Sequence, residues 1–210
     1  MSKQEQGQKK SPPDWLFFVL GIVLASAFGF WLTPTILYAE KTQPMDFSHK
    51  VHMEQVSDGC ASCHTFREDG SFTGIPAVAN CQECHSEEAM GDNIENPKHR
   101  EAERILAEEY IAKGKPIAWD VYSGQPDCVF FSHVAHVKNA ELECATCHGT
   151  HGETDNLRPY EYNRLTGYSR DIWGRSLLGL GGPPERMKMD DCAACHRENG
   201  VRDACFVCHK

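Results

Sequence analysis

The stretch Cys60-Ala-Ser-Cys63-His64 decides how this chain folds. The same pattern, two cysteines separated by two residues and followed at once by histidine, recurs at residues 81–85, 144–148, 192–196 and 205–209. It is the attachment pattern of c-type haem, in which both thiols add across porphyrin vinyl groups and the histidine becomes the proximal iron ligand. The pattern therefore predicts ten thioether cysteines, namely Cys60, Cys63, Cys81, Cys84, Cys144, Cys147, Cys192, Cys195, Cys205 and Cys208. It also predicts five proximal ligands, namely His64, His85, His148, His196 and His209.

Other uses of paired cysteines explain this pattern less well. Two cysteines separated by two residues also occur in zinc sites and in redox-active dithiols. Neither use requires histidine directly after the second cysteine, and here histidine follows in all five motifs. The sequence therefore indicates a multihaem cytochrome c that carries electrons.

The composition indicates that the protein alone has too small a core. Forty per cent of the 210 residues are hydrophobic, but many of them lie in one run near the N-terminus. The remainder buries too little apolar surface to be stable without help, so we expect the haems to complete the core and the haem-free chain to be unfolded. The expected fold class is mainly α with much irregular coil: an N-terminal transmembrane helix followed by two tandem small haem modules.

The N-terminal run predicts a membrane anchor over residues 15–39. Residues 15–32 are almost wholly apolar, long enough to cross a hydrocarbon core of about 30 Å as a helix. Lys3, Lys9 and Lys10 precede the run, which predicts that residues 1–14 stay in the cytoplasm and the haem domain is exported to the periplasm. The alternative is a cleaved signal peptide, because Ala25-Ser26-Ala27 resembles a cleavage site. The apolar run continues past that site, which favours a single-pass anchor in the inner membrane.

The exported part is acidic. The whole chain has a net charge of −9, and residues 1–39 carry +1, which leaves −10 for the rest. Such a surface argues against nucleic acid as a partner and suits a basic soluble protein. The simpler interpretation is that the charge maintains solubility.

A repeat divides the exported region in two. Phe47-Ser48-His49-Lys50-Val51-His52 precedes Cys60, and Phe131-Ser132-His133-Val134-Ala135-His136 precedes Cys144, each phenylalanine lying 13 residues before its cysteine. The repeat predicts related haem modules at 40–115, with two motifs, and at 116–210, with three.

One helix and one insertion stand out between the motifs. Asn96 is a good N-cap, Pro97 a good first residue and Gly114 a good end, and apolar residues recur between them at helical spacing. We expect this helix to be structural, with the Glu and Arg side chains of its other face in contact with water. Residues 152–190 form an insertion rich in Tyr, Arg, Gly and Pro, which is interpreted either as a docking segment for a partner subunit or as a loop that covers haem.

Six histidines remain as candidate distal ligands: His49, His52, His99, His133, His136 and His151. Low-spin electron-transfer haems need a second strong ligand on iron, and four of the six lie in the duplicated pairs. Because these ligands are enough to close the iron sites, we expect no catalytic centre within the chain itself.

Two further residues have alternative interpretations. Cys128 is the eleventh cysteine, either a buried free thiol or the single thioether of a sixth haem. Met189 lies three residues before Cys192, either packing against a haem or binding its iron, with Met187 the weaker candidate for that role.

The Phe-Ser-His-x-x-His pattern before a haem motif resembles the small low-potential multihaem cytochromes of sulfate-reducing bacteria. In that family both histidines of the pair ligate different haems. The resemblance implies this arrangement for the pair His49 and His52 and for the pair His133 and His136.

A longer resemblance covers most of residues 12–210. The anchor, the five motifs, Trp119-Asp120-Val121 before the second repeat, and the Met189 to His196 stretch resemble the multihaem subunits of two complexes. One is alternative complex III, and the other is the Qrc menaquinone reductase complex of sulfate reducers. The resemblance implies a complex with a molybdopterin-oxidoreductase-like protein, an iron–sulfur protein and integral quinone-binding proteins.

The two complexes run in opposite directions. The menaquinone reductase takes electrons from a soluble periplasmic tetrahaem cytochrome and passes them to menaquinone, whereas alternative complex III oxidises quinol. The ligand pairs, the acidic surface and Cys128 favour the menaquinone reductase, whose cytochrome subunit is thought to carry six haems. Other hypotheses are an anchored multihaem quinol dehydrogenase, a catalytic multihaem reductase, and an electron-storing cytochrome without a fixed complex.

Overall fold

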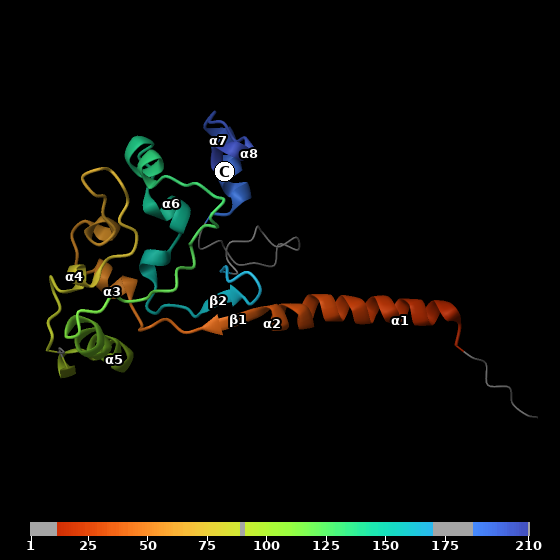
Figure 1. Cartoon of the computed structure of the whole chain (residues 1–210), viewed down its shortest axis with the longest axis horizontal. Helices are drawn as coiled ribbons and strands as arrows, with labels where there is room; N and C mark the ends of the chain where they lie inside the picture. Colours follow the sequence, from red (N-terminus) through yellow and green to blue (C-terminus); the bar gives the residue numbers. More distant parts are fainter. Residues whose placement is uncertain (1–11, 89–90, 170–186, 210) are drawn as a thin grey trace, which may run out of the picture.

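The chain is described by a computed structural model, which covers residues 12–88, 91–169 and 187–209. A long helical rod projects from a small domain of short helices and irregular chain (Figure 1). The α-helices are α1 Asp14–Ala27, α2 Thr33–Leu37, α3 His49–Met53, α4 Val78–Cys81, α5 Pro97–Ile105, α6 Cys144–His148, α7 Met189–Glu198 and α8 Cys205–Cys208. Wider π-type turns span Phe28–Leu32, Leu106–Ile111 and Val134–Asn139, and tighter 3-10 turns span Gly59–Ser62, Gly91–Asn93 and His151–Glu153.

The rod is the helix expected for an anchor. Helices α1 and α2 are continuous through the turn between them and give 24 residues, Asp14–Leu37. At about 1.5 Å per residue this is roughly 36 Å, enough to cross a bilayer by length and composition. Several of its large apolar side chains, among them Trp15, Phe18 and Trp31, are more than half exposed. The helix stops two residues before the expected end at 39, because the chain from Tyr38 onward is a strand.

A two-stranded sheet joins the base of the rod to the domain. Strand β1, Tyr38–Lys41, pairs antiparallel with β2, Tyr160–Asn163, with Tyr38 opposite Asn163 and Lys41 opposite Tyr160. The N–H of Arg164 also donates to the carbonyl of Leu37 at 2.8 Å. Strand β2 belongs to the 152–190 insertion, so part of that insertion is a structural partner of the strand that follows the rod. The insertion residues Arg170, Trp173, Arg175 and 178–184 lie outside the described part of the chain.

Helix α5 begins where the sequence predicts, and its continuation through the Leu106–Ile111 turn ends just before the predicted Gly114. The Asn96 side chain accepts from the N–H of Lys98 at 3.0 Å, Pro97 is the first helical residue, and Gly114 has a φ of 58° after the last turn. The face predicted to be apolar is buried through Ala102, Leu106 and Ile111, which pack with Met45.

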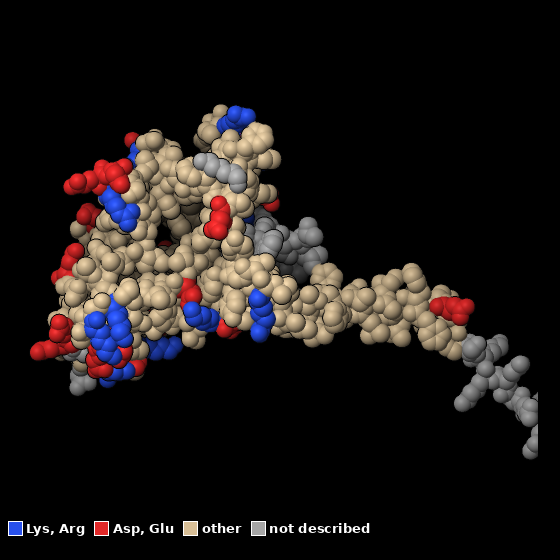
Figure 2. Space-filling model, in the orientation of Figure 1, with Lys and Arg blue, Asp and Glu red and all other residues tan. Residues whose placement is uncertain are grey.

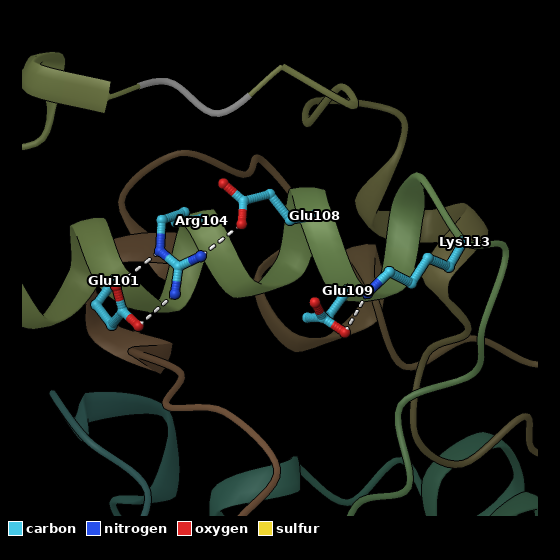
Figure 3. Close-up of polar contacts among 5 residues, drawn as sticks. All are labelled: Glu101, Arg104, Glu108, Glu109 and Lys113. Atoms are coloured by element: carbon cyan, nitrogen blue, oxygen red, sulfur yellow. Dashed lines mark hydrogen bonds and ion pairs between the residues drawn. The ribbon is translucent and has the colours of Figure 1, made fainter.

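The other face of α5 is mostly charged and exposed. Arg104 bridges Glu101 and Glu108, and Lys113 pairs with Glu109 (Figure 3). Exposed ion pairs of this kind each contribute about 0–1 kcal/mol. Glu103 lies on the buried side of this helix instead and is only 5% exposed.

The protein core is small. Within the described residues, the buried apolar side chains are Met45, Ala102, Leu106, Ala107 and Ile111, all in or beside α5. Away from this helix, the domain consists of short helices and loops around the histidines and cysteines. The observed fold is therefore mainly helix and coil, as expected.

Candidate haem-binding sites

Each motif is built on a helical turn. The first lies on the Gly59–Ser62 turn, the second at the end of α4, and the other three on α6, α7 and α8. The N–H groups of His64, His85 and His209 donate to the carbonyls of Cys60, Cys81 and Cys205 at 2.8–2.9 Å. Residues three apart on such a turn share a face. Both sulfurs of a motif can therefore meet one porphyrin edge while the histidine follows beneath it.

The cysteines do not form zinc sites in this structure. All eleven are free thiols, and burial raises the pKa of Cys63, Cys81, Cys144, Cys147 and Cys192. A zinc site needs thiolates, usually with four protein ligands around one point. Among residues 12–88, 91–169 and 187–209, no group of three or more His, Cys, Asp or Glu side chains converges in this way.

Several histidines are held in the orientation that iron requires. A hydrogen bond from Nδ1–H to a carbonyl leaves Nε2 as a lone pair, which is the usual arrangement of a metal-binding imidazole. Four candidate ligands have Nδ1 at 2.7–3.2 Å from a backbone carbonyl: His52 from Ser48, His64 from Gly74, His136 from Ser132, and His196 from Arg202.

Two pairs of rings have the spacing of imidazoles that share one iron. Metal–nitrogen bonds are about 2 Å, and the ring centre lies roughly 1 Å further back, so such rings are about 6 Å apart between centroids. The His52 and His85 centroids are 6.2 Å apart. The centroids of His136 and His196 are 6.0 Å apart, with planes only 15° from parallel. In both pairs the distal candidate faces a motif that is not the next one along the chain.

The repeated phenylalanines support these histidines, a role that sequence reasoning missed. Phe47 stacks on His52 at 4.3 Å and meets His49 edge-on at 4.8 Å. Phe131 makes the equivalent contacts with His136 at 4.5 Å and His133 at 4.8 Å. The strict repetition of phenylalanine before each histidine pair was the available signal, since such repetition indicates a shared packing role.

His49 and His151 come from distant parts of the chain but lie together. Their ring centroids are 4.5 Å apart, closer than two imidazoles on one iron. The Thr154 hydroxyl lies 3.3 Å from Nδ1 of His49. Burial, followed by the nearby His151 and other histidines, lowers the pKa of His49 to about 4. His49 is therefore neutral near pH 7, which is the form that binds metal.

The motifs approach one another in a definite spatial order. Burial raises the pKa of Cys81 and Cys144, and the proximity of Cys63 and Cys60, respectively, raises it further. These contacts join the second motif to the first and the first to the third. Burial likewise raises the pKa of Cys192, with Cys147 and Cys208 adding to it, which joins the third, fourth and fifth motifs. The spatial order is therefore second, first, third, fourth, fifth.

Main-chain and ring contacts agree with this order. Phe72, in the loop after the first motif, stacks on His133 at 4.1 Å, just ahead of the third motif. The N–H of Met187, ahead of the fourth motif, donates to the carbonyl of Cys147 in the third at 2.9 Å.

Comparison with known proteins identifies the family. No family model matches the chain. A curated protein of Nitratidesulfovibrio vulgaris, the "Menaquinone reductase, multiheme cytochrome c subunit", is 40% identical over 221 aligned residues, which cover 98% of this chain and 95% of that protein. The chain belongs to this family. As a menaquinone reductase cytochrome subunit it is a multihaem cytochrome c, and the attachment motifs, the free cysteines and the oriented histidines fit haem c as the bound group.

Cys128 lies beside the fifth motif of this cytochrome subunit. The N–H of Phe130 donates to the carbonyl of Cys208 at 2.7 Å, and Val129 pairs with His209 in an antiparallel bridge. Cys128 itself is exposed, so the interpretation as a buried thiol is wrong. Its sulfur is accessible to a group attached at the fifth motif, which is the last in the spatial order of the motifs.

The remaining candidates are placed less specifically. His99 lies on α5 in electrostatic range of His52, so it stands near the His52 and His85 pair. Met189 is the first residue of α7 and is 67% exposed, whereas Met187 is partly buried beside the third motif. The described contacts bring neither methionine to a motif histidine.

Proposed function

We propose that this chain is a membrane-anchored periplasmic cytochrome through which electrons enter a menaquinone reductase complex. It accepts electrons from a soluble low-potential tetrahaem cytochrome and relays them towards the quinone-reducing membrane subunits. The observation that carries the proposal is the unbroken spatial row of five haem motifs in a chain closely similar to a menaquinone reductase subunit. The chain is not an enzyme by itself, and the reduction of quinone occurs on other subunits.

The row supports a relay because cysteines of neighbouring motifs lie close enough to raise one another's pKa. A thioether joins the edge of a porphyrin, so adjacent sulfurs imply adjacent porphyrin edges. Electrons pass one at a time along the row. Two electrons and two protons complete the reduction of one quinone outside this chain.

The ligand assignment follows from the ring spacing. His52 and His85 bind the iron of the second motif, and His136 and His196 bind the iron of the fourth. The proximity of His64 contributes to the lowered pKa of both His49 and His133, after burial in each case, so both lie near the first motif and are candidates for its second ligand. His49 and His151 serve different irons because their rings are too close to share one. Each of the two assigned pairs lies within one module, His52 with His85 in 40–115 and His136 with His196 in 116–210.

The two ends of the row face different surroundings. In Figure 1, α4 and α5 lie at the end of the domain farthest from α1, whereas α7 and α8 lie on the side towards the rod. With α1 and α2 in the inner membrane, the second motif is the membrane-distal end and is accessible to a soluble donor. The fourth and fifth motifs lie on the membrane side, towards quinone-binding, iron–sulfur and molybdopterin-oxidoreductase-like subunits.

The charge near the distal end suits a basic donor. Acidic side chains gather with interspersed basic ones over the end of the domain opposite the rod (Figure 2). Glu83, Glu87 and Glu88, in and just after the second motif, are exposed. Complementary charge of this kind raises the association rate of a basic partner.

A sixth haem held by Cys128 alone would extend the row at its membrane side, because Cys128 lies beside the fifth motif. The intact mass of the mature chain and a haem-peptide digest that covers Cys128 test this assignment. Six haems, one of them on the Cys128 peptide, support it. Five haems and a free Cys128 refute it and remove one reason to prefer this complex over alternative complex III.

The relay is tested by removing one end of the row at a time in the assembled complex. Replacing Cys81 and Cys84 by alanine is expected to abolish quinone reduction by the reduced tetrahaem cytochrome. The remaining haems, reduced by dithionite, should still be oxidised by menaquinone. Replacing Cys205 and Cys208 by alanine is expected to give the opposite pattern, with haems that the tetrahaem cytochrome reduces but menaquinone no longer oxidises.

Haem counts on both variants confirm that only the intended haem is lost. The reverse pattern would place electron entry at the membrane side. Fast reduction of the haems by menaquinol, with no response to the tetrahaem cytochrome, would favour the quinol-oxidising function of alternative complex III.

A further inference from the structure

The proximal histidine of the second motif differs from the other oriented histidines in what faces its Nδ1 atom. His52, His64, His136 and His196 each direct Nδ1 at a neutral backbone carbonyl. Nδ1 of His85 is buried and makes no hydrogen bond within the described part of the chain. A carboxylate oxygen, Oε1 of Glu103, lies 3.8 Å from it.

Glu103 is placed there by its helix. It lies on α5 between Ala102 and Leu106, which belong to the core, and its side chain is only 4% exposed. Its neighbours Glu101 and Arg104 are on the exposed face and pair with each other (Figure 3). Burial of a carboxylate is costly unless a partner compensates for the lost hydration. The placement of this buried carboxylate next to a metal-binding imidazole indicates a role beyond packing.

We propose that Glu103 is a positioning residue that orients His85 and lowers the reduction potential of the haem at the second motif. The inference rests on the proposed function, which assigns His85 to iron. A modest rotation of either side chain converts the 3.8 Å contact into a hydrogen bond from Nδ1–H to the carboxylate. Such a bond makes the imidazole a stronger electron donor to its metal, as carboxylate–histidine pairs do in metal sites generally.

Both effects of the carboxylate act in the same direction. The stronger imidazole donor and the buried negative charge each stabilise Fe(III) relative to Fe(II), so the one-electron potential falls. In a relay that begins at the second motif, a low reduction potential of its haem makes electron transfer to the later haems thermodynamically favourable. Histidines that face neutral carbonyls lack this contribution.

Spectroelectrochemical titration of the full-length holoprotein tests the proposal. Glu103→Gln removes the charge at nearly constant volume, and it is expected to shift the midpoint of one haem to higher potential while the others keep theirs. Glu103→Asp keeps the charge and should remain nearer to wild type than Glu103→Gln. Glu101→Gln, on the same helix but exposed, is the matched control and should leave the titration unchanged. A Glu103→Gln protein with a full haem complement and an unaltered titration would overturn the proposal.

A measurement on the wild type covers the case in which the glutamine variant loses haem. In protein labelled with 15N-histidine, one axial imidazole should show the Nδ1 shift of a ring hydrogen-bonded to a carboxylate, distinct from the rest. Uniform shifts for all axial imidazoles would contradict the proposal. The haem-peptide digest separates this question from the proposed function: if the peptide with Cys81 and Cys84 carries no haem, the proposed function fails independently of Glu103.

Discussion

At the scale of single residues, the sequence predicts the types of iron ligand but not which of them share an iron. The haem motifs predict the proximal histidines, and the duplicated Phe-Ser-His-x-x-His stretches predict four distal candidates. Both predictions are possible because the patterns are local in sequence. Pairing depends on contacts across the chain, such as that of His52 with His85, 33 residues later. No local pattern encodes those contacts. The sequence also did not predict which backbone carbonyls accept hydrogen bonds from the histidine rings, because those contacts depend on loop conformation.

Replacing His52 by alanine tests the crossed pairing. We expect the haem of the second motif to lose its sixth ligand and become high-spin, because the His52 ring lies at bis-histidine distance from His85. The haem of the first motif, which is the next one along the chain, should stay low-spin. Assigned haem methyl signals in NMR spectra distinguish the two haems. His136→Ala is the companion variant and should alter the fourth motif rather than the third. Loss of the sixth ligand only at the first motif would contradict the assignment.

At the scale of elements, helix α5 was predictable and the sheet was not. Its cap, its first residue, its apolar face and its end all follow from rules that act within four residues. Strand β2 lies more than 110 residues from its partner β1, and each strand is only four residues long. Such short strands carry little periodicity to detect. The burial of Glu103 was missed because a glutamate is expected to face water unless its charge is paired with another group inside the protein.

Leu106→Ala is expected to destabilise the holoprotein by roughly 2–5 kcal/mol, because it opens a cavity in the small core around α5. Glu108→Ala, on the exposed face of the same helical segment, should cost less than about 1 kcal/mol, because it removes only a surface ion pair. Denaturant titration followed by far-ultraviolet circular dichroism compares the two variants. Equal effects would mean that the buried face of α5 does not hold the domain together.

At the scale of the whole molecule, the chain joins an exposed apolar rod to a domain with a small apolar core. The composition predicted both features, because an unbroken apolar run and a scarcity of periodic apolar stretches are properties of the entire sequence. The order of the motifs in space was not predictable, because the first motif lies between the second and the third. Sequence order alone would have placed the second motif in that position.

The haem-free chain is expected to show no cooperative unfolding. Its described buried apolar side chains are only Met45, Ala102, Leu106, Ala107 and Ile111, too few to offset the conformational entropy of the domain. Circular dichroism of protein produced without haem attachment, heated beside the holoprotein, makes the comparison. A sigmoidal melt in the haem-free sample would show that the polypeptide folds by itself.

The pairing of β1 with β2 joins the rod directly to the domain. Strand β1 follows α2 without an intervening linker, and its partner strand belongs to the domain. A helix of 24 residues is longer than an average bilayer core requires, and helices accommodate such an excess by tilting. With the helix in a membrane, as proposed, a tilt of the rod would move the domain as well, and the far end of the domain would move farther than its base. The thickness of the bilayer would then influence the height of the second motif above the membrane surface.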